Sequence, residues 1–102
     1  MKNETAFRGI KQFINRTYQT ATNSTDLTIT RKQIIEYIIE NDITFSPSTI
    51  DNYRRMFSVV NILTSGDGKG SYRILQPIPE NLKLRGLRIL YKQTLYYERT
   101  TK

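Results

Sequence analysis

The dipeptide Ser46-Pro47 constrains the fold of this chain more than any other feature of its sequence. A serine hydroxyl at a helix N-terminus accepts a hydrogen bond from a free backbone N–H, and proline suits the first helical position because its φ is already helical. Apolar residues then recur at the spacings of one buried helix face, namely Ile50, Tyr53, Phe57 and Val60. The sequence therefore predicts a half-buried helix over residues 47–60.

Two further helices are predicted upstream. The first spans residues 4–18, where apolar residues recur with the same periodicity, namely Phe7, Ile10, Phe13, Ile14 and Tyr18. A polar loop and a short β-prone run at 27–30 follow. Thr30 and Gln33 then form a capping box, in which each side chain satisfies the other residue's backbone N–H. This box predicts a second helix with a wide apolar face, made by Ile34, Ile35, Ile38 and Ile39.

The segments on either side of the third helix also show local signals. Ile43 and Phe45 lie in the short connection before it, and we expect both to pack inward. After it, we expect Asn61 to adopt the left-handed conformation that asparagine tolerates. Two strand-like runs then flank the glycine-rich segment 65–71, and together they predict a β-hairpin. These runs are 62–64 and 72–75.

A fourth helix is predicted over residues 84–99, after two prolines have ended the hairpin. Its apolar residues form a narrow seam of Leu84, Leu87, Tyr91 and Leu95. A basic edge runs beside this seam. We expect the seam to pack on the first helix or on a second copy of the chain, which would make a homodimer.

The net charge of +7 is concentrated in the second half of the chain. Residues 1–46 contain six basic and five acidic side chains, whereas residues 47–102 contain ten basic and four acidic ones. A positive field attracts polyanions, either nucleic acid or an anionic membrane surface. The absence of cysteine and histidine excludes disulfides and thiolate metal sites, and removes the commonest general base. We therefore expect no enzymatic activity, cofactor, metal or small-molecule ligand.

Membrane attachment is not expected. No run approaches the roughly 20 apolar residues of a membrane span, and the N-terminus lacks the apolar core of a signal peptide. The last helix carries basic and aromatic residues, but its apolar edge is narrow and tryptophan is absent. We expect a cytoplasmic location.

The order of these elements resembles that of the winged helix-turn-helix family. This α+β fold has a three-helix core, a short strand and a β-hairpin wing, and the resemblance covers residues 4–76. In detail, segment 46–57 and the following Asn61-Ile62-Leu63 resemble the family's recognition helix and first wing strand. The resemblance implies a winged helix-turn-helix domain over residues 1–78. Residues 79–102 would be a linker and a basic helix that belongs to the same domain or to a dimer interface.

Members of this family are mostly sequence-specific DNA-binding regulators. The resemblance therefore implies a small transcriptional regulator that binds double-stranded DNA, of a size that phages and mobile elements encode. It places helix 47–60 in the major groove and the wing, residues 65–71, on the backbone. Arg54 departs from the family pattern, because an aliphatic core residue is common there, and we expect Tyr53 to take over its packing.

The outward face of the third helix holds the candidates for base contacts. On a helical wheel of residues 47–60, the side opposite the buried face carries Ser48, Asn52, Arg55 and Val59. Thr49 and Met56 flank this outward face. Asparagine pairs bidentately with adenine and arginine with guanine. The base-reading candidates are Ser48, Thr49, Asn52 and Arg55. The DNA-backbone candidates are Arg31, Lys32, Arg54, Lys69, Arg73, Arg85, Arg88 and Lys92.

Other interpretations stay open. The outward face of the third helix could simply be the solvated side of an amphipathic helix, and the same fold could pack on a protein partner without reading bases. RNA is a further possibility, because the A-form groove is read by shape. The glycine string in 65–71 has neither P-loop nor dinucleotide-fingerprint spacing and opens a strand, which argues against a nucleotide-binding loop.

Overall fold

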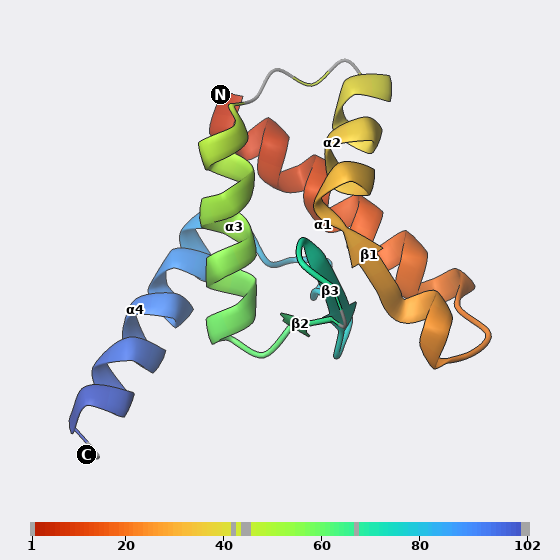
Figure 1. Cartoon of the computed structure of the whole chain (residues 1–102). Helices are drawn as coiled ribbons and strands as arrows, with labels where there is room; N and C mark the ends of the chain where they lie inside the picture. Colours follow the sequence, from red (N-terminus) through yellow and green to blue (C-terminus); the bar gives the residue numbers. More distant parts are fainter. Residues whose placement is uncertain (1, 42, 44–45, 67, 101–102) are drawn as a thin grey trace.

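The computed structural model describes residues 2–41, 43, 46–66 and 68–100. Within these residues the chain is an α+β fold with four α-helices, one 3-10 helix and a three-stranded antiparallel sheet (Figure 1). In chain order the elements are α1 (Lys2–Thr20), η1 (Ser24–Leu27), β1 (Thr28–Thr30), α2 (Arg31–Glu40), α3 (Pro47–Val59), β2 (Leu63–Ser65), β3 (Ser71–Ile74) and α4 (Leu84–Thr100). None of the helices described is long and apolar enough to cross a membrane.

The predicted helix caps are confirmed. Thr30 and Gln33 form both hydrogen bonds of the capping box at the start of α2. The Ser46 hydroxyl accepts a hydrogen bond from the backbone N–H of Thr49, and Pro47 is the first residue of α3. Asn61, which follows α3, has the predicted left-handed backbone, with φ of 65°. These local signals place the start of α3 as the sequence predicted, and the helix ends at Val59, one residue before the predicted end.

The sheet pairs the short strand that precedes α2 with the hairpin that follows α3. Its strand order is β1-β3-β2, and both pairs are antiparallel. The strands are shifted slightly from the prediction: Leu27 belongs to η1, Ile62 is buried just before β2, and Leu75 follows β3 with an exposed side chain. The hairpin itself is confirmed, since β2 pairs with β3 across the glycine-rich segment.

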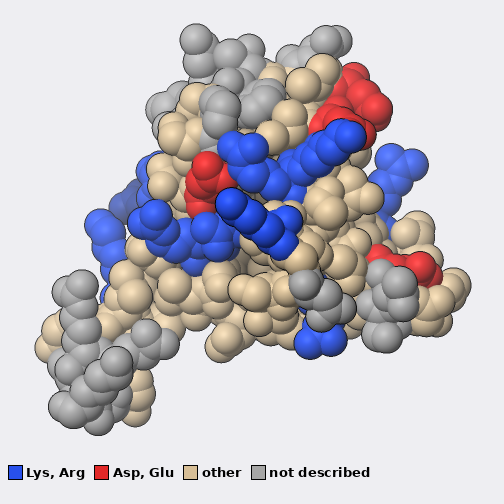
Figure 2. Space-filling view, viewed as in Figure 1, with Lys and Arg blue, Asp and Glu red and all other residues tan. Residues whose placement is uncertain are grey.

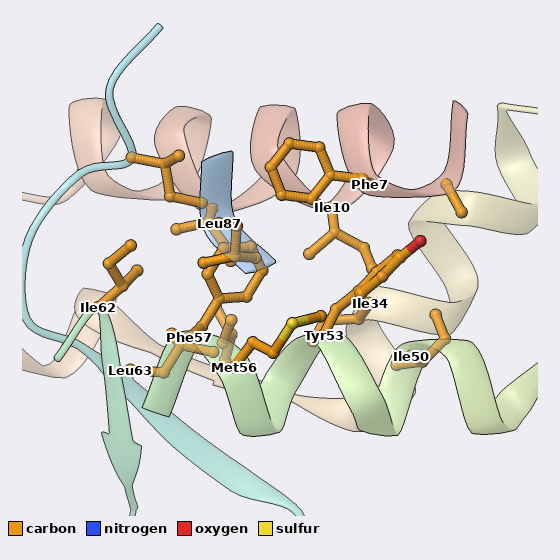
Figure 3. Packing of buried hydrophobic residues seen from close by; sticks show 14 of the residues in the cluster. Phe7, Ile10, Ile34, Ile50, Tyr53, Met56, Phe57, Ile62, Leu63 and Leu87 are labelled. Carbon is orange, nitrogen blue, oxygen red and sulfur yellow. The ribbon is translucent and has the colours of Figure 1, made fainter. Parts of the chain in front are cut away.

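The core lies between α1, α2, α3 and the inner face of the sheet (Figure 3). Tyr53 and Phe57 point from α3 toward Phe7 of α1, whose ring lies 6.0 Å from each of theirs. The predicted inward register of α3 is confirmed, because Ile50, Tyr53 and Phe57 are all fully buried. Ile43 packs against the same core, whereas Phe45 lies outside the described residues.

Three apolar side chains lie elsewhere than predicted. Tyr18 and Ile39 are exposed, the latter by 60% of its surface, although both were assigned to buried helix faces. Met56 was placed beside the outward face of α3, but only 8% of it is exposed and it joins the core. Helix periodicity identifies a face, but it does not show where along or around the helix a neighbouring element covers it.

Helix α4 packs against α3 (Figure 1). Leu84 and Leu87 are buried in the core, and Tyr91 packs against it. Of the other elements, α3 is the one that α4 contacts most extensively. The sequence had predicted a contact with the first helix or with a second copy, and α3 was not among these alternatives. The far half of α4 projects away from the helices and the sheet.

The linker before α4 is fixed to α1 by polar contacts. The Asn15 side-chain amide donates to the backbone oxygen of Ile78 at 2.8 Å and accepts from its N–H at 2.7 Å. Lys11 Nζ donates to the backbone oxygens of Glu80 and Leu82, each at 3.0 Å. These contacts hold the chain where it turns into α4, and so they help to set the position of α4 beside α3.

Candidate functional site

The face of α3 that points away from the core carries the predicted base-reading residues. Ser48, Asn52 and Arg55 are exposed, and Thr49 is half-buried. Two of these side chains also serve the helix cap, since the Ser48 and Thr49 hydroxyls lie 3.1 and 2.9 Å from the Ser46 hydroxyl. Asn52 and Arg55 are therefore the residues of this set with the greatest freedom to contact a ligand.

A groove of about 510 Å³ lies between this face of α3 and the side of α4. Its lining residues are Thr49, Asn52, Tyr53, Arg55, Met56, Arg88, Tyr91 and Lys92. The structure thus brings together three predicted base-reading residues and two predicted backbone-contacting residues, which come from helices far apart in the sequence. The buried Met56 and Tyr53 line the same groove.

On the α2 side of α3, the predicted backbone contacts have carboxylate partners. Arg31 Nε donates to Asp51 Oδ1 at 2.9 Å, and both side chains are partly exposed. This hydrogen bond, and then the charge of Asp51, raises the pKa of Arg31 above its ordinary value. Lys32 is exposed and lies 3.9 Å from Glu36, one turn along α2.

Arg54 lies between α3 and the sheet. Its guanidinium carbon is 5.4 Å from the centre of the Tyr72 ring, a cation–π distance. Its Nε is buried and has no hydrogen-bond partner among the described residues. Arg54 is half-buried rather than fully solvent-facing, and Tyr53 does take the buried position beside it, as predicted.

The hairpin carries Lys69 and Arg73, both exposed. Tyr72 and Ile74 face the core, so the intervening Arg73 points to the opposite side of the sheet. The hairpin is tied to α2, because the backbone N–H of Arg31 donates to the oxygen of Gly70 at 2.9 Å. Neither Lys69 nor Arg73 lines the α3–α4 groove.

Figure 2 shows basic side chains gathered in a band across α3, reaching toward α4 on one side and toward α2 on the other. The basic residues on these three elements that the sequence singled out are Arg31, Lys32, Arg54, Arg55, Arg85, Arg88 and Lys92. Arg85 is exposed on α4 but is outside the groove lining. The predicted contact of α4 with a second copy stays a prediction.

Sequence reasoning missed two residues that shape this surface. Asp51 lies on the flank of α3 and pairs with an arginine twenty residues away. Tyr72 supports Arg54, and its inward position follows from the alternation of β3 with the buried Ile74. A helical wheel of α3 alone shows neither the contact of Asp51 with Arg31 nor that of Arg54 with Tyr72.

Among the residues that the structure describes, no group of three or more acidic side chains is placed to hold a metal ion.

The chain matches no protein-family model, and no curated protein or solved structure is significantly similar to it.

Replacing Asp51 with asparagine should tighten binding to a polyanion. The change removes a negative charge from the α3 surface and releases Arg31 for a phosphate contact. For random-sequence duplex DNA we expect roughly three- to tenfold tighter binding at low salt, and a log–log salt slope that is steeper by about 0.9. Stability should change little, because exposed ion pairs contribute little to folding and this pair is partly exposed.

The matched control is Glu40→Gln, which removes the same charge at the exposed end of α2. Fluorescence anisotropy over a range of salt concentrations measures both variants. Equal changes in the two would mean that net charge alone is responsible and that Asp51 does not restrain Arg31.

Proposed function

We propose that this protein is a sequence-specific DNA-binding protein of the winged helix-turn-helix type, acting as a small transcriptional regulator. In this proposal α3 enters the major groove, and the hairpin β2–β3 is the wing, which contacts the backbone through Lys69. The observation that carries the proposal is the outward face of α3, where the exposed Asn52 and Arg55 share a groove with Arg88 and Lys92.

The residue chemistry of this face suits base readout. The B-DNA major groove is about 12 Å wide and admits an α-helix, and its base edges pair bidentately with asparagine and arginine. Asn52 and Arg55 are three residues apart on α3, so their side chains lie on the same side of the helix. The surrounding cations supply the sequence-independent attraction to phosphate on which base readout depends.

We favour duplex DNA over duplex RNA as the ligand, because the proposed base contacts come from an exposed α-helix, α3. The major groove of A-form RNA is too deep and narrow for side chains to read. An exposed helix with polar and basic residues on its outer face has no comparable entry into RNA. An acidic protein partner would be attracted by the same charges. Binding to such a partner, however, does not explain why an amide and a guanidinium lie next to each other on one face of α3.

The test begins with selection of bound sequences from a random duplex library. Affinities are then measured for the selected site and for a scrambled duplex. Arg55→Ala should reduce the preference for the selected site by about 5- to 150-fold, which corresponds to about 1–3 kcal/mol for one bidentate base contact. Lys69→Ala, the matched control on the hairpin, should weaken binding to both duplexes by the same factor.

Two results would contradict this function. If selection enriches no sequence, or if both variants affect both duplexes equally, α3 does not read bases. If a duplex RNA of the selected sequence competes as well as the DNA, the protein recognises nucleic acid by charge or shape instead.

A further inference from the structure

We propose that the α3–α4 groove holds the phosphates of one DNA strand, with Arg88 and Lys92 as the residues that bind them. This inference rests on the proposed DNA-binding function and specifies which side of α3 the backbone occupies. In this proposal α4 binds the phosphates of the DNA strand directly, while α3 faces the bases.

The predicted backbone contacts on the two sides of α3 differ in their ion-pair partners. On the α2 side, Arg31 and Lys32 each lie within ion-pair distance of a carboxylate. Among the described residues, Arg88 and Lys92 form no ion pair, and the groove is lined by no acidic side chain. No carboxylate of the described residues therefore pairs with the positive charge at the groove, whereas the charge on the α2 side is partly neutralised.

The predicted backbone contacts also differ in their position relative to α3. Arg54 packs on Tyr72, and Arg73 points to the outer face of the sheet. Of the eight predicted backbone contacts, Arg88 and Lys92 are the two that line a groove together with Asn52 and Arg55. A strand in this groove would present its phosphates to α4 and its base edges to α3.

The two groove cations are spaced one helical turn apart on α4. Arg88 and Lys92 are four residues apart, so they lie on the same side of α4 and about 6 Å apart along its axis. Each phosphate of a strand carries one negative charge. Two cations one helical turn apart can therefore each contact a different phosphate of the same strand, and Arg55 extends the positive charge across the groove. Between these charges, the half-buried Tyr91 offers an apolar surface against which a sugar can pack.

The test compares three charge-matched double variants on a random-sequence duplex. Arg88→Gln/Lys92→Gln removes the groove cations, Arg31→Gln/Lys32→Gln removes those on the α2 side, and Arg8→Gln/Arg16→Gln removes two exposed cations of α1. The groove variant should lower the log–log salt slope by about 1.8, which is two phosphate contacts. We expect it to weaken binding at least tenfold more than the α1 variant, whose slope should equal that of the wild type.

Circular dichroism and urea unfolding establish that each variant is folded. If the groove and α1 variants lose affinity equally, or if the α2-side variant shows the larger loss of slope, the strand does not lie in this groove. Either result leaves DNA binding itself intact. Failure of the wild-type protein to bind duplex at low salt would instead overturn the proposed function.

Discussion

Replacing Asn15 with leucine should lower the free energy of unfolding by about 2–4 kcal/mol. Asn15 is only 8% exposed, and its amide makes two hydrogen bonds to the backbone of Ile78, which is itself buried. Leucine can neither donate nor accept, so the N–H and the oxygen of Ile78 would both lose their partner. Each buried polar group left unpaired costs about 1–3 kcal/mol, because it has also lost its water.

The matched control is Gln12→Leu, which makes the same kind of change at an exposed position of α1. Its effect should stay within about 0.5 kcal/mol. Urea denaturation followed by circular dichroism measures both, with the slope m checked for two-state behaviour. A loss below about 1 kcal/mol for Asn15→Leu would show that the Ile78 backbone finds other partners and that Asn15 does not anchor the linker.

The same substitution connects stability to the candidate site. The linker held by Asn15 leads directly into α4, whose buried Leu84 and Leu87 set its packing beside α3. Because the groove exists only where α4 lies against α3, loosening the linker should also weaken any binding that depends on Arg88 and Lys92. Gln12→Leu should leave that binding unchanged.

Most of α3 could be predicted from the sequence, because its signals are local. The Ser46 cap, the Pro47 start and the left-handed Asn61 each depend on a few neighbouring residues. The inward face followed from a periodicity that the helix itself imposes. Met56 could not be placed in the same way, because its burial depends on the packing of α4, which lies some thirty residues further along the chain.

The candidate site was predictable as a set of residues but not as an arrangement. Composition and periodicity identified Asn52, Arg55, Arg88 and Lys92 one helix at a time, and the groove that unites them arises from contact between two helices. The neutralisation of Arg31 by Asp51 is also a tertiary contact. The outward direction of Arg73, by contrast, was available from strand alternation, since it stands between two inward-facing residues.

The affinity for duplex DNA should change strongly with salt concentration, and we expect this change to be the largest of all the effects predicted for this protein. Phosphate contacts release counterions, so the logarithm of the binding constant falls with the logarithm of salt concentration, with a slope of about −0.9 per contact. On a random-sequence duplex Arg55 has no preferred base to read, so its guanidinium is free to contact phosphate instead. Together with Arg88 and Lys92 in the groove and Lys69 on the hairpin, it provides four exposed cations for such contacts. A slope of about −3.6 corresponds to about 150-fold weaker binding when salt rises from about 50 to about 200 mM.

The salt dependence of wild-type binding to a random-sequence duplex is therefore the most direct test of whether this face binds DNA. Fluorescence anisotropy of a labelled duplex, titrated with protein at several salt concentrations, gives the slope. We expect tight binding at low salt and a slope of about −3 to −5. The absence of binding at low salt, or an affinity that does not change with salt, would contradict it.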